Sequence, residues 1–277
     1  MIVYNEILID ELKDQLCAVN PEVRGWLDEN CPKLVSPGDI YLTFSMVPRF
    51  VARSSFPVEK VGSFYTILRE LGHNSDNWTC DQIGRLIVLL SAGRFEGESF
   101  AAVIRQLLDT ADIYEQVSIY KSLMFLPFRD LLVARVVDGV RTNVNDVFEA
   151  IALENAYPAT YFDELSWNQL VLKALFTSKP IRKIISIDKR NNPRLARMAL
   201  GLACERRAAG RVVNPDLWRL MDGYLDEKNT EDIKQLLSGT DMEKKAAILL
   251  CSSSVEPTIA RLVAADVVVN YTWDDIN

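Results

Sequence analysis

Apolar residues recur every three to four positions along most of the chain, which is the spacing of helices with one buried face. Long alternation of apolar and polar residues, the pattern of strands, is nearly absent. The run Val267–Trp273 fits a short strand, but it also continues a helical pattern. The pattern predicts an all-α protein. We expect helices near residues 2–16, 21–30, 38–54, 58–72, 79–92, 96–109, 112–124, 129–139, 143–154, 163–178, 193–209, 214–225, 230–238, 241–252 and 255–267.

Several of these helices begin with recognisable capping residues. Thr79 and Gln82 fit a capping box, and Asp112 with Glu115 fits the same pattern. Asn192-Pro193 and Asn214-Pro215 each place a capping Asn before a Pro in the first helical position. These helix starts are therefore predicted from local chemistry as well as from periodicity.

Connections between the expected helices are short, so consecutive helices should pack as antiparallel pairs. Such a series predicts a right-handed α-solenoid-like array of antiparallel helix pairs. Residues 232–250 resemble a HEAT-type unit, because one helix ends in Leu-Leu-x-Gly and Asp241 opens a second with an Ala and Leu stripe. We predict one all-helical domain over 1–277, with a main helical array at 1–225 and a HEAT-like C-terminal extension at 226–277.

Asn, Arg and aromatic residues are crowded between about Arg135 and Arg197, in helical patterns that Leu and Ala would satisfy. At 100° per residue, the helix Leu165–Phe176 has one narrow polar sector, which includes Lys173, and is otherwise apolar. Asn168 falls inside the apolar arc, where an amide needs a hydrogen-bond partner. Either Asn168 ties a neighbouring loop in place or it lines a ligand pocket, and we favour the first.

The helix near 143–154 places Glu149 opposite its apolar stripe, so we expect Glu149 to be solvated rather than a general acid or base. Thr142 or Asn143 is the expected cap, which puts Arg141 near a helix N-terminus where anions bind favourably. Asn155-Ala156-Tyr157-Pro158 is expected to form a turn.

A polar loop, Asp188–Asn192, precedes the next helix. Asp188 and Arg190 could pair with each other, with Lys173 or with a ligand. Lys173 lies on the polar sector of its helix and is expected to be hydrated, so we do not expect a Schiff base there.

Charge and composition exclude several classes of function. The net charge of −7 argues against nucleic-acid binding, which usually requires a basic face. The single histidine, His73, excludes sites that need two histidines. It follows Gly72, the predicted C-cap of a helix, where a His usually serves the helix dipole. Five scattered cysteines are typical of reduced thiols in a cytosolic protein. We find no nucleophile elbow, phosphate-binding loop or zinc pattern, and we expect no cofactor, metal or catalytic residue.

The chain begins Met1-Ile2-Val3 and soon reaches Asn5 and Glu6, so we expect no signal peptide. The longest apolar runs fall well short of the roughly 20 residues needed to span a bilayer. Any link to a membrane is therefore expected to run through a partner.

The central stretch also carries a family resemblance. It reads R-T-N…F-E-A-I-A-L-x-N-x-Y-P…F-D-E…W-N-Q-L-V-L-K-A-L-F over 141–176, D-x-R-x-N-P-x-L-A-R over 188–197 and G-R-x-V-x-P-x-L-W-R over 210–219. With Tyr41–Arg49 and Trp78–Gln82, these motifs resemble the EboA family over most of the chain. The first 35 residues and the tail after Asp266 match loosely, and Lys179–Lys183 departs from the family pattern.

The resemblance implies a role in metabolite traffic, within a bacterial gene cluster whose other products resemble a UbiA-type prenyltransferase, a TatD-type hydrolase and a sugar-phosphate-isomerase-like protein. Other products of this cluster, including the membrane-bound prenyltransferase, are therefore the expected partners, together with a small-molecule ligand. The expected location is the cytoplasm, at the periphery of the inner membrane through a partner. The resemblance supplies no catalytic residue.

Three functions remain open at this stage. The first is a non-enzymatic binding or scaffold protein of a metabolite-trafficking pathway that exports a secondary metabolite or prenylated product. The second is an enzyme with a site in the 141–197 block that acts on a small metabolite. The third is a structural hub with a polar core. The candidate ligand- or partner-binding residues are Arg141, Asn143, Glu149, Asn155, Tyr157, Trp167, Asn168, Lys173, Asp188, Arg190 and Asn192.

Overall fold

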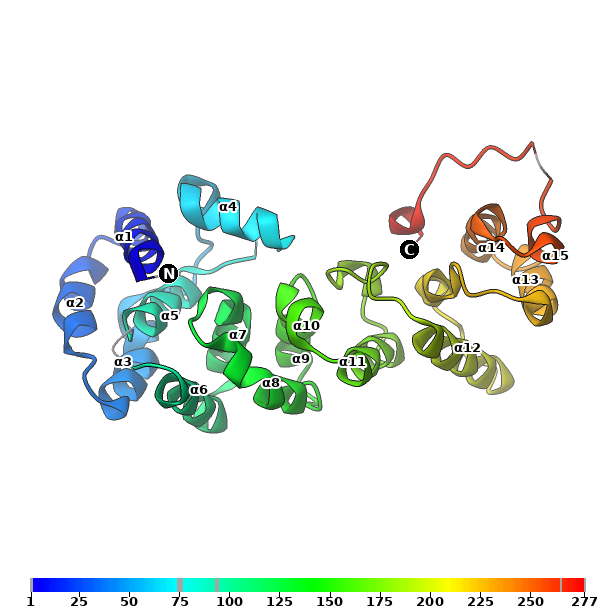
Figure 1. The fold of residues 1–277 in the computed structure, drawn as a ribbon. Coiled ribbons are helices and arrows are strands. Elements are labelled where there is room, and N and C mark those ends of the chain that lie inside the picture. The colour runs from blue at the N-terminus through cyan, green and yellow to red at the C-terminus, as the bar shows by residue number, and fades with distance from the viewer. Residues whose placement is uncertain (1, 74–76, 93–94, 265, 277) are drawn as a thin grey trace. The chain divides into compact units, whose positions relative to one another are not determined.

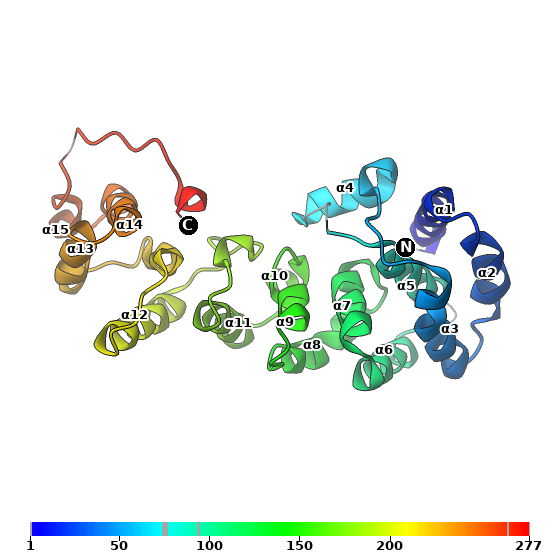
Figure 2. The same cartoon turned by 180° about the vertical axis from the view of Figure 1, so that it is seen from behind.

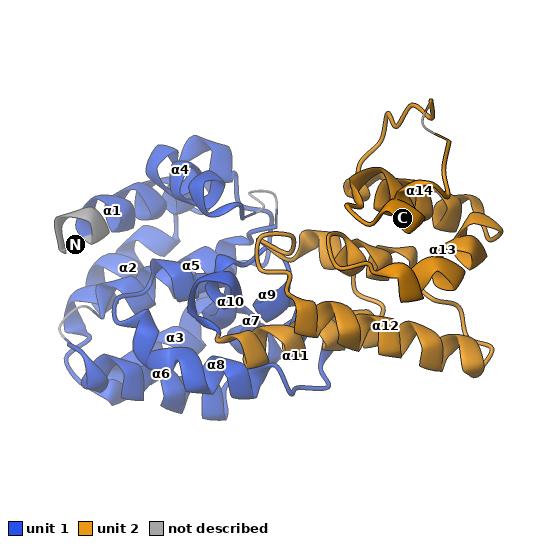
Figure 3. Cartoon of the chain, turned by 45° about the vertical axis from the view of Figure 1, so that its right-hand side comes forward, with its two compact units in different colours: residues 1–162 blue, residues 163–277 orange. Residues whose placement is uncertain are grey.

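A computed structural model describes residues 2–73, 77–92, 95–264 and 266–276, with side chains from Glu6 onward. The described chain is all-helical, as predicted, and its extended segments pair only at an isolated bridge between Ser55 and Thr79. It forms two compact units, which meet in the sequence at Phe162 and Asp163 (Figure 3). The predicted single domain over 1–277, with its main array at 1–225 and its extension at 226–277, stays a prediction.

Unit 1 contains ten α-helices in its described part (Figure 1). They are α1 (Ile2–Val19), α2 (Val23–Asn30), α3 (Pro37–Phe50), α4 (Gly62–Leu71), α5 (Cys80–Ser91), α6 (Glu98–Thr110), α7 (Ile113–Ser122), α8 (Val133–Gly139), α9 (Asn145–Ala152) and α10 (Ala156–Tyr161). Short 3-10 turns lie between some of them, at η1 (Cys31–Lys33), η2 (Val58–Lys60), η3 (Leu123–Phe125) and η4 (Arg129–Leu132).

Helix α5 is the centre of unit 1. It packs against α1, α3 and α7, and Figure 1 and the reverse view in Figure 2 both show it among these helices. All residues from Cys80 to Leu90 are buried, including an ion pair in which Arg85 donates to Asp81 at 2.8 Å. The Arg85 guanidinium also lies 5.5 Å from the ring centroid of Phe44 on α3. The pair lets one helix remain buried on every side while carrying two charged groups.

Unit 2 is built from α11 (Glu164–Phe176), α12 (Pro193–Ala208), α13 (Thr230–Leu237), α14 (Asp241–Ser253) and α15 (Pro257–Ala260). Its 3-10 helices are η5 (Ile181–Lys183), η6 (Pro215–Met221), η7 (Glu227–Asn229) and η8 (Trp273–Asp275). Helix α11 packs on α12, while η6 packs on both α12 and α14. Trp167 and Trp218 are among the largest buried side chains and lie in the core of this unit.

The predicted caps are confirmed where the chemistry is local. Gln82 Oε1 accepts from the backbone of Thr79 at 3.3 Å, and the Asp112–Glu115 box closes at 2.8 and 3.0 Å. Asn192 Oδ1 accepts from Leu195 N at 2.9 Å.

Other helix boundaries differ from the prediction. Residues 215–221 form a 3-10 helix, only 257–260 are α-helical in the last predicted helix, and Val267–Trp273 is not a strand. The predicted turn at 155–158 is the start of α10, because Pro158 lies in the first helical turn, where a missing N–H costs nothing. Helix α9 begins at Asn145, so neither Thr142 nor Asn143 is its cap residue.

Gly84 allows α3 and α5 to approach closely, which makes a Gly84→Ala substitution informative. A Cβ atom at this position would lie 2.9 Å from Val47 Cγ1, on a β-branched side chain that is itself buried. We expect a loss of about 1–3 kcal/mol in the free energy of unfolding, measured by urea denaturation.

Gly25→Ala is the matched control, since nothing lies within 4 Å of a Cβ atom there and Gly25 is also helical. It should be neutral or stabilising by up to about 1 kcal/mol. Equal effects at Gly84 and Gly25 would contradict the tight packing of α3 on α5.

Candidate functional site

The candidate residues divide between the two units. Arg141, Asn143, Glu149, Asn155 and Tyr157 belong to unit 1. Trp167, Asn168, Lys173, Asp188, Arg190 and Asn192 belong to unit 2.

Three unit 1 candidates lie on or before α9. Arg141 is exposed and forms an ion pair with Asp138 at 3.2 Å, and Asn143 is exposed. Such an exposed pair contributes little to stability. Glu149 is half-buried on α9 rather than fully solvated as predicted. The structure thus gives Arg141 a carboxylate partner within its own segment.

Asn155 and Tyr157 fix the start of α10. The buried Asn155 amide donates to Tyr120 O at 3.0 Å and to Ala150 O at 2.8 Å, while its Oδ1 accepts from Tyr157 N at 2.9 Å. Tyr157 Oη donates to Arg129 O at 2.5 Å, and burial raises the pKa of Tyr157. These bonds use the Asn155 amide as a cap and tie α10 to segments about 30 residues away in sequence.

His73 also contacts the start of α10, and the prediction that it serves the dipole of the preceding helix was wrong. Gly72 is the left-handed C-cap of α4, as predicted, but the His73 side chain does not serve that helix. Its Nε2 accepts from Ala156 N at 2.9 Å and so caps α10 instead. Burial, helped by nearby Lys121, lowers the pKa of His73 to about 4, which keeps the imidazole neutral and able to accept.

Lys121 on α7 is a residue with a shifted pKa that the sequence did not reveal. Its Nζ donates to Gln82 Oε1 at 2.9 Å and to Asn77 O, and it lies 4.5 Å from the ring centroid of Trp78. Burial lowers the pKa of Lys121 to about 8, although Glu154 and Asp81 favour its charged form. The partners are 39 and 44 residues away, so helix periodicity could not have found them.

In unit 2, Asn168 and Asn192 bind each other. Asn192 Nδ2 donates to Asn168 Oδ1 at 2.9 Å, and Asn168 Nδ2 donates to Asn192 Oδ1 at 3.2 Å. Because Asn192 is also the cap of α12, the pair joins α11 to the start of α12. The buried amide predicted in α11 therefore holds a neighbouring loop in place.

Trp167 and Arg190 form a second contact beside this pair. The Arg190 guanidinium lies 4.7 Å from the ring centroid of Trp167, which is fully buried. Partial burial lowers the pKa of Arg190, while Asp163 favours its charge. Asp163 also caps α11, accepting from Ser166 N at 2.7 Å. The planar guanidinium is thus held over an aromatic face, an arrangement that stabilises both groups.

Asp188 pairs with Arg219, a residue that was not among the candidates. Arg219 Nε and Nη2 donate to the two Asp188 oxygens, each at 2.6 Å, and Arg219 Nη1 donates to Asp274 at 2.6 Å. Burial lowers the pKa of Arg219, but the bonds to Asp188 and Asp274 outweigh this effect and raise it. Asp188 therefore has a bidentate partner in its own unit.

The outer face of α11 is more apolar than expected. The prediction placed the apolar arc of this helix inside, yet Leu165 is 46% exposed and Phe176 is 64% exposed. With half-buried Leu172, they fall within about 40° of one another around the helix. We call these three residues the α11 stripe. Lys173 beside it is half-buried rather than hydrated, and burial lowers its pKa.

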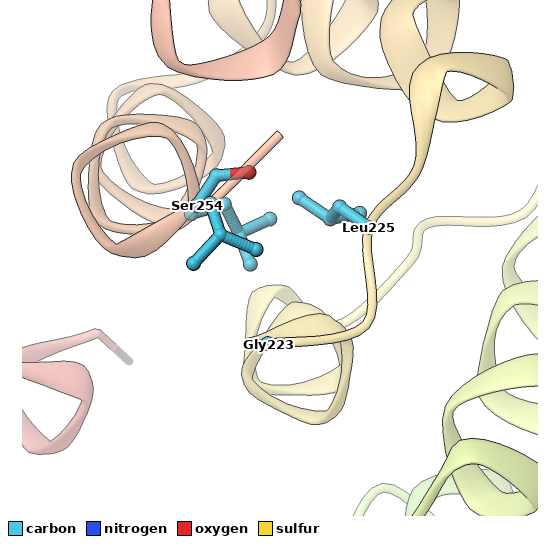
Figure 4. Close-up of a pocket in the computed structure, with 5 residues that line it drawn as sticks. Gly223, Leu225 and Ser254 are labelled. Carbon is cyan, nitrogen blue, oxygen red and sulfur yellow. The ribbon is translucent and has the colours of Figure 1, made fainter. Parts of the chain in front are cut away.

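A hollow in unit 2 lies between η6 and α14 and is lined by Gly223, Leu225, Leu250, Ser254 and Val255 (Figure 4). Its empty volume of about 190 Å³ includes open solvent. This is less than the roughly 300 Å³ at which pockets for drug-sized ligands begin. None of the candidate residues lines it.

Within the described ranges, no three His, Cys, Asp or Glu side chains gather in a way that could hold a metal ion. No helix in the same ranges has the length and apolar character required to cross a bilayer.

The role of neutral His73 predicts a specific pH dependence. Between its usual pKa of 6.5 and its folded pKa of about 4, the unfolded chain binds a proton that the folded chain does not. The free energy of unfolding should therefore fall as pH decreases, by about 2 kcal/mol between pH 7 and pH 5 from this group. A His73→Gln chain keeps an acceptor but lacks this titration, so urea unfolding should show a flatter dependence. The same pH dependence in both chains would refute the assignment.

The Asn168–Asn192 pair makes a second prediction for stability. Asn168→Ala leaves part of the Asn192 amide unpaired, which should lower the free energy of unfolding by about 1–3 kcal/mol. Gln169→Ala removes an exposed amide from the next position of the same helix and should change it by less than about 0.5 kcal/mol. Thermal or urea unfolding measures both, and an equal cost at the two positions would argue against the pair.

Comparison with known proteins agrees with the motifs in these elements. A family model described as "Metabolite traffic protein EboA" matches residues 6–222, a range that includes all eleven candidate residues and Arg219. A search of curated proteins and a search of solved structures found no match. Because the family match covers well over half of the 277 residues, the chain belongs to the EboA family of metabolite traffic proteins.

Proposed function

We propose that this protein is a non-enzymatic binding or scaffold protein of a metabolite-trafficking pathway, and that it contacts a partner through the outer face of α11. The family assignment supports the role in metabolite traffic. The α11 stripe is the observation that carries the binding role, because two large apolar side chains on one helix face remain exposed.

The α11 stripe has the properties of a protein-binding surface. Exposed apolar groups aligned on one face tend to mark interaction sites, whereas single scattered ones are common on any protein. Lys173 lies beside the stripe and supplies a positive charge at its edge. A partner with an apolar centre and an acidic rim would fit this face.

The polar groups behind α11 keep this face rigid. The Asn168–Asn192 pair joins α11 to α12, and Trp167 is fixed beneath Arg190. A surface that is already ordered loses less conformational entropy on binding. Arg and Trp are also frequent in binding hot spots.

The finer parts of the proposal come from the family resemblance. Partners would be other products of the Ebo gene cluster, with a membrane-bound UbiA-type prenyltransferase among them. Such a partner would bring a cytoplasmic protein to the periphery of the inner membrane. Packing of α13 on α14 supports the proposed HEAT-like pair at 226–277 and, with it, a solenoid-like helical array.

The alternative is an enzyme that uses Glu149, Lys173, Asp188 and Arg190. Its site would require the four groups to converge with perturbed pKa values. The bidentate bond from Arg219 gives Asp188 a structural partner, which favours the binding role over this alternative. The enzyme stays a separate hypothesis.

A comparison of Phe176→Ser with Leu42→Ser tests the binding role. Both residues are 64% exposed, but Leu42 lies on α3 in unit 1. The tagged chains would be purified from the native host, and co-purifying proteins and metabolites quantified by mass spectrometry. Wild type and Leu42→Ser should retain a cluster protein or a metabolite, while Phe176→Ser should retain about tenfold less of it.

Both substitutions should leave stability within about 0.5 kcal/mol of wild type, so thermal unfolding serves as the control for folding. Equal retention by the two variants would overturn the role of α11. Retention of nothing by wild type would overturn the binding function itself.

A further inference from the structure

The segment Thr272–Ile276 at the end of unit 2 returns to η6 and is held there by side chains. Trp273 Nε1 donates to Asp222 Oδ2 at 3.0 Å, and Asp274 accepts from Arg219 at 2.6 Å. Ile276 is fully buried. We call these five residues the docked segment. Its three anchors are an aromatic ring, a carboxylate and an aliphatic side chain.

The docked segment has its own local structure. Thr272 and Asp275 form a capping box, with Asp275 Oδ2 accepting from Thr272 N at 2.8 Å and from its hydroxyl at 3.0 Å. This box caps the 3-10 turn η8 (Trp273–Asp275). The turn presents Trp273 and Asp274 to η6 without support from a longer helix, as short recognition motifs do.

The chain that leads to the docked segment is exposed and lacks regular structure. Residues 266–272 contain no helix (Figure 1). Among them, Val268 is 84% exposed. Close to the docked segment, Tyr271 Oη donates to Lys245 O at 3.4 Å. The described residues 266–271 therefore form a largely exposed tether, and the main anchors of the docked segment lie within 273–276.

Arg219 requires an acidic partner on the side where Asp274 lies. Its side chain is only 8% exposed, while the Asp188 and Asp274 side chains are 61% and 69% exposed. Asp188 satisfies Nε and Nη2, so Nη1 would lose its carboxylate if the docked segment left. A buried guanidinium edge without an acceptor is costly, and another carboxylate at the same place would be favoured.

We infer that η6 and its neighbours form a binding site for short peptides with the pattern Trp-Asp-x-Ile, which the docked segment occupies and which a partner protein with an exposed copy of that pattern can enter. The receptor residues Arg219 and Asp222 lie inside the family match, and the docked segment lies beyond it. The charge of Arg219 selects the acid, and Asp222 selects the indole N–H. The inference rests on the proposed binding role, and its receptor residues are not those of the α11 stripe.

The peptide site can be tested on the full chain. In Trp273→Ala/Asp274→Asn, the docked segment loses two anchors, so the site should open without any change in chain length. A fluorescein-labelled peptide with the sequence of residues 270–277 is then titrated, and binding is followed by fluorescence anisotropy. Wild type and the matched tether variant Asp266→Asn should bind the labelled peptide at least about tenfold more weakly than the opened chain does. In both, the chain's own docked segment competes for the site at high effective concentration.

Two further comparisons address the chemistry of the site. A peptide with the Asp274→Asn change should bind the opened chain at least about tenfold more weakly, since a charge-assisted bond is lost. Adding Arg219→Lys to the opened chain should weaken the unchanged peptide similarly, while exposed Arg211→Lys should not. Circular dichroism confirms that each chain is folded.

Equal binding by opened and wild-type chains, equal binding of the two peptides, or no binding by a folded opened chain would each overturn the inference. A concentration-dependent wild-type dimer that dissociates on adding the peptide would assign the site to exchange between copies and also overturn it. The assay contains no metabolite and no pathway protein, so its failure leaves the proposed function standing, and failure of the co-purification test leaves the peptide site standing.

Discussion

The two carboxamides of Asn168 and Asn192 bind each other inside unit 2, and much of this unit depends on that pair. An unpaired amide in the apolar arc of α11 would cost about 1–3 kcal/mol of stability. The pair meets this requirement and places the cap of α12 against α11. Leu165 and Phe176 on the same helix remain exposed. The bond thus stabilises a helix that also carries an exposed apolar face.

Unit 1 meets the same requirement with different groups. Asn155 and His73 accept from successive N–H groups at the start of α10, and the low pKa of His73 keeps its acceptor available at neutral pH. The Asp81–Arg85 pair allows α5 to be buried on all sides. Polar residues that would suggest chemistry in a linear sequence are therefore largely structural here. They hold helix ends and buried charges in place.

How much could be predicted depended on the distance between partners in the sequence. Helix spans and the caps at Thr79, Asp112 and Asn192 were predictable, because periodicity and capping act within a few residues. The contacts of His73 with Ala156 and of Arg219 with Asp274 span 83 and 55 residues, and no local sequence pattern predicts them. The family could be identified because its motifs are long.

The prediction for the apolar arc of α11 was wrong at Leu165 and Phe176, which are exposed. A helix with one narrow polar sector is usually buried on most of its surface, and that rule placed Leu165 and Phe176 inside. The rule fails on this helix because periodicity reports the apolar character of a face and not what covers it. Asn168 was correctly placed inside, yet its partner Asn192 could be identified only from the structure.

In-cell cross-linking with a lysine-reactive reagent, followed by mass spectrometry, tests the central claim most directly. Lys173 lies beside the α11 stripe, and Lys179 follows the same helix. If α11 binds a partner, these two lysines should form cross-links to another protein of the metabolite-traffic pathway in the native host, and Phe176→Ser should remove them. Cross-links to such a protein that arise from unit 1 lysines alone, or that persist in Phe176→Ser, would contradict the account.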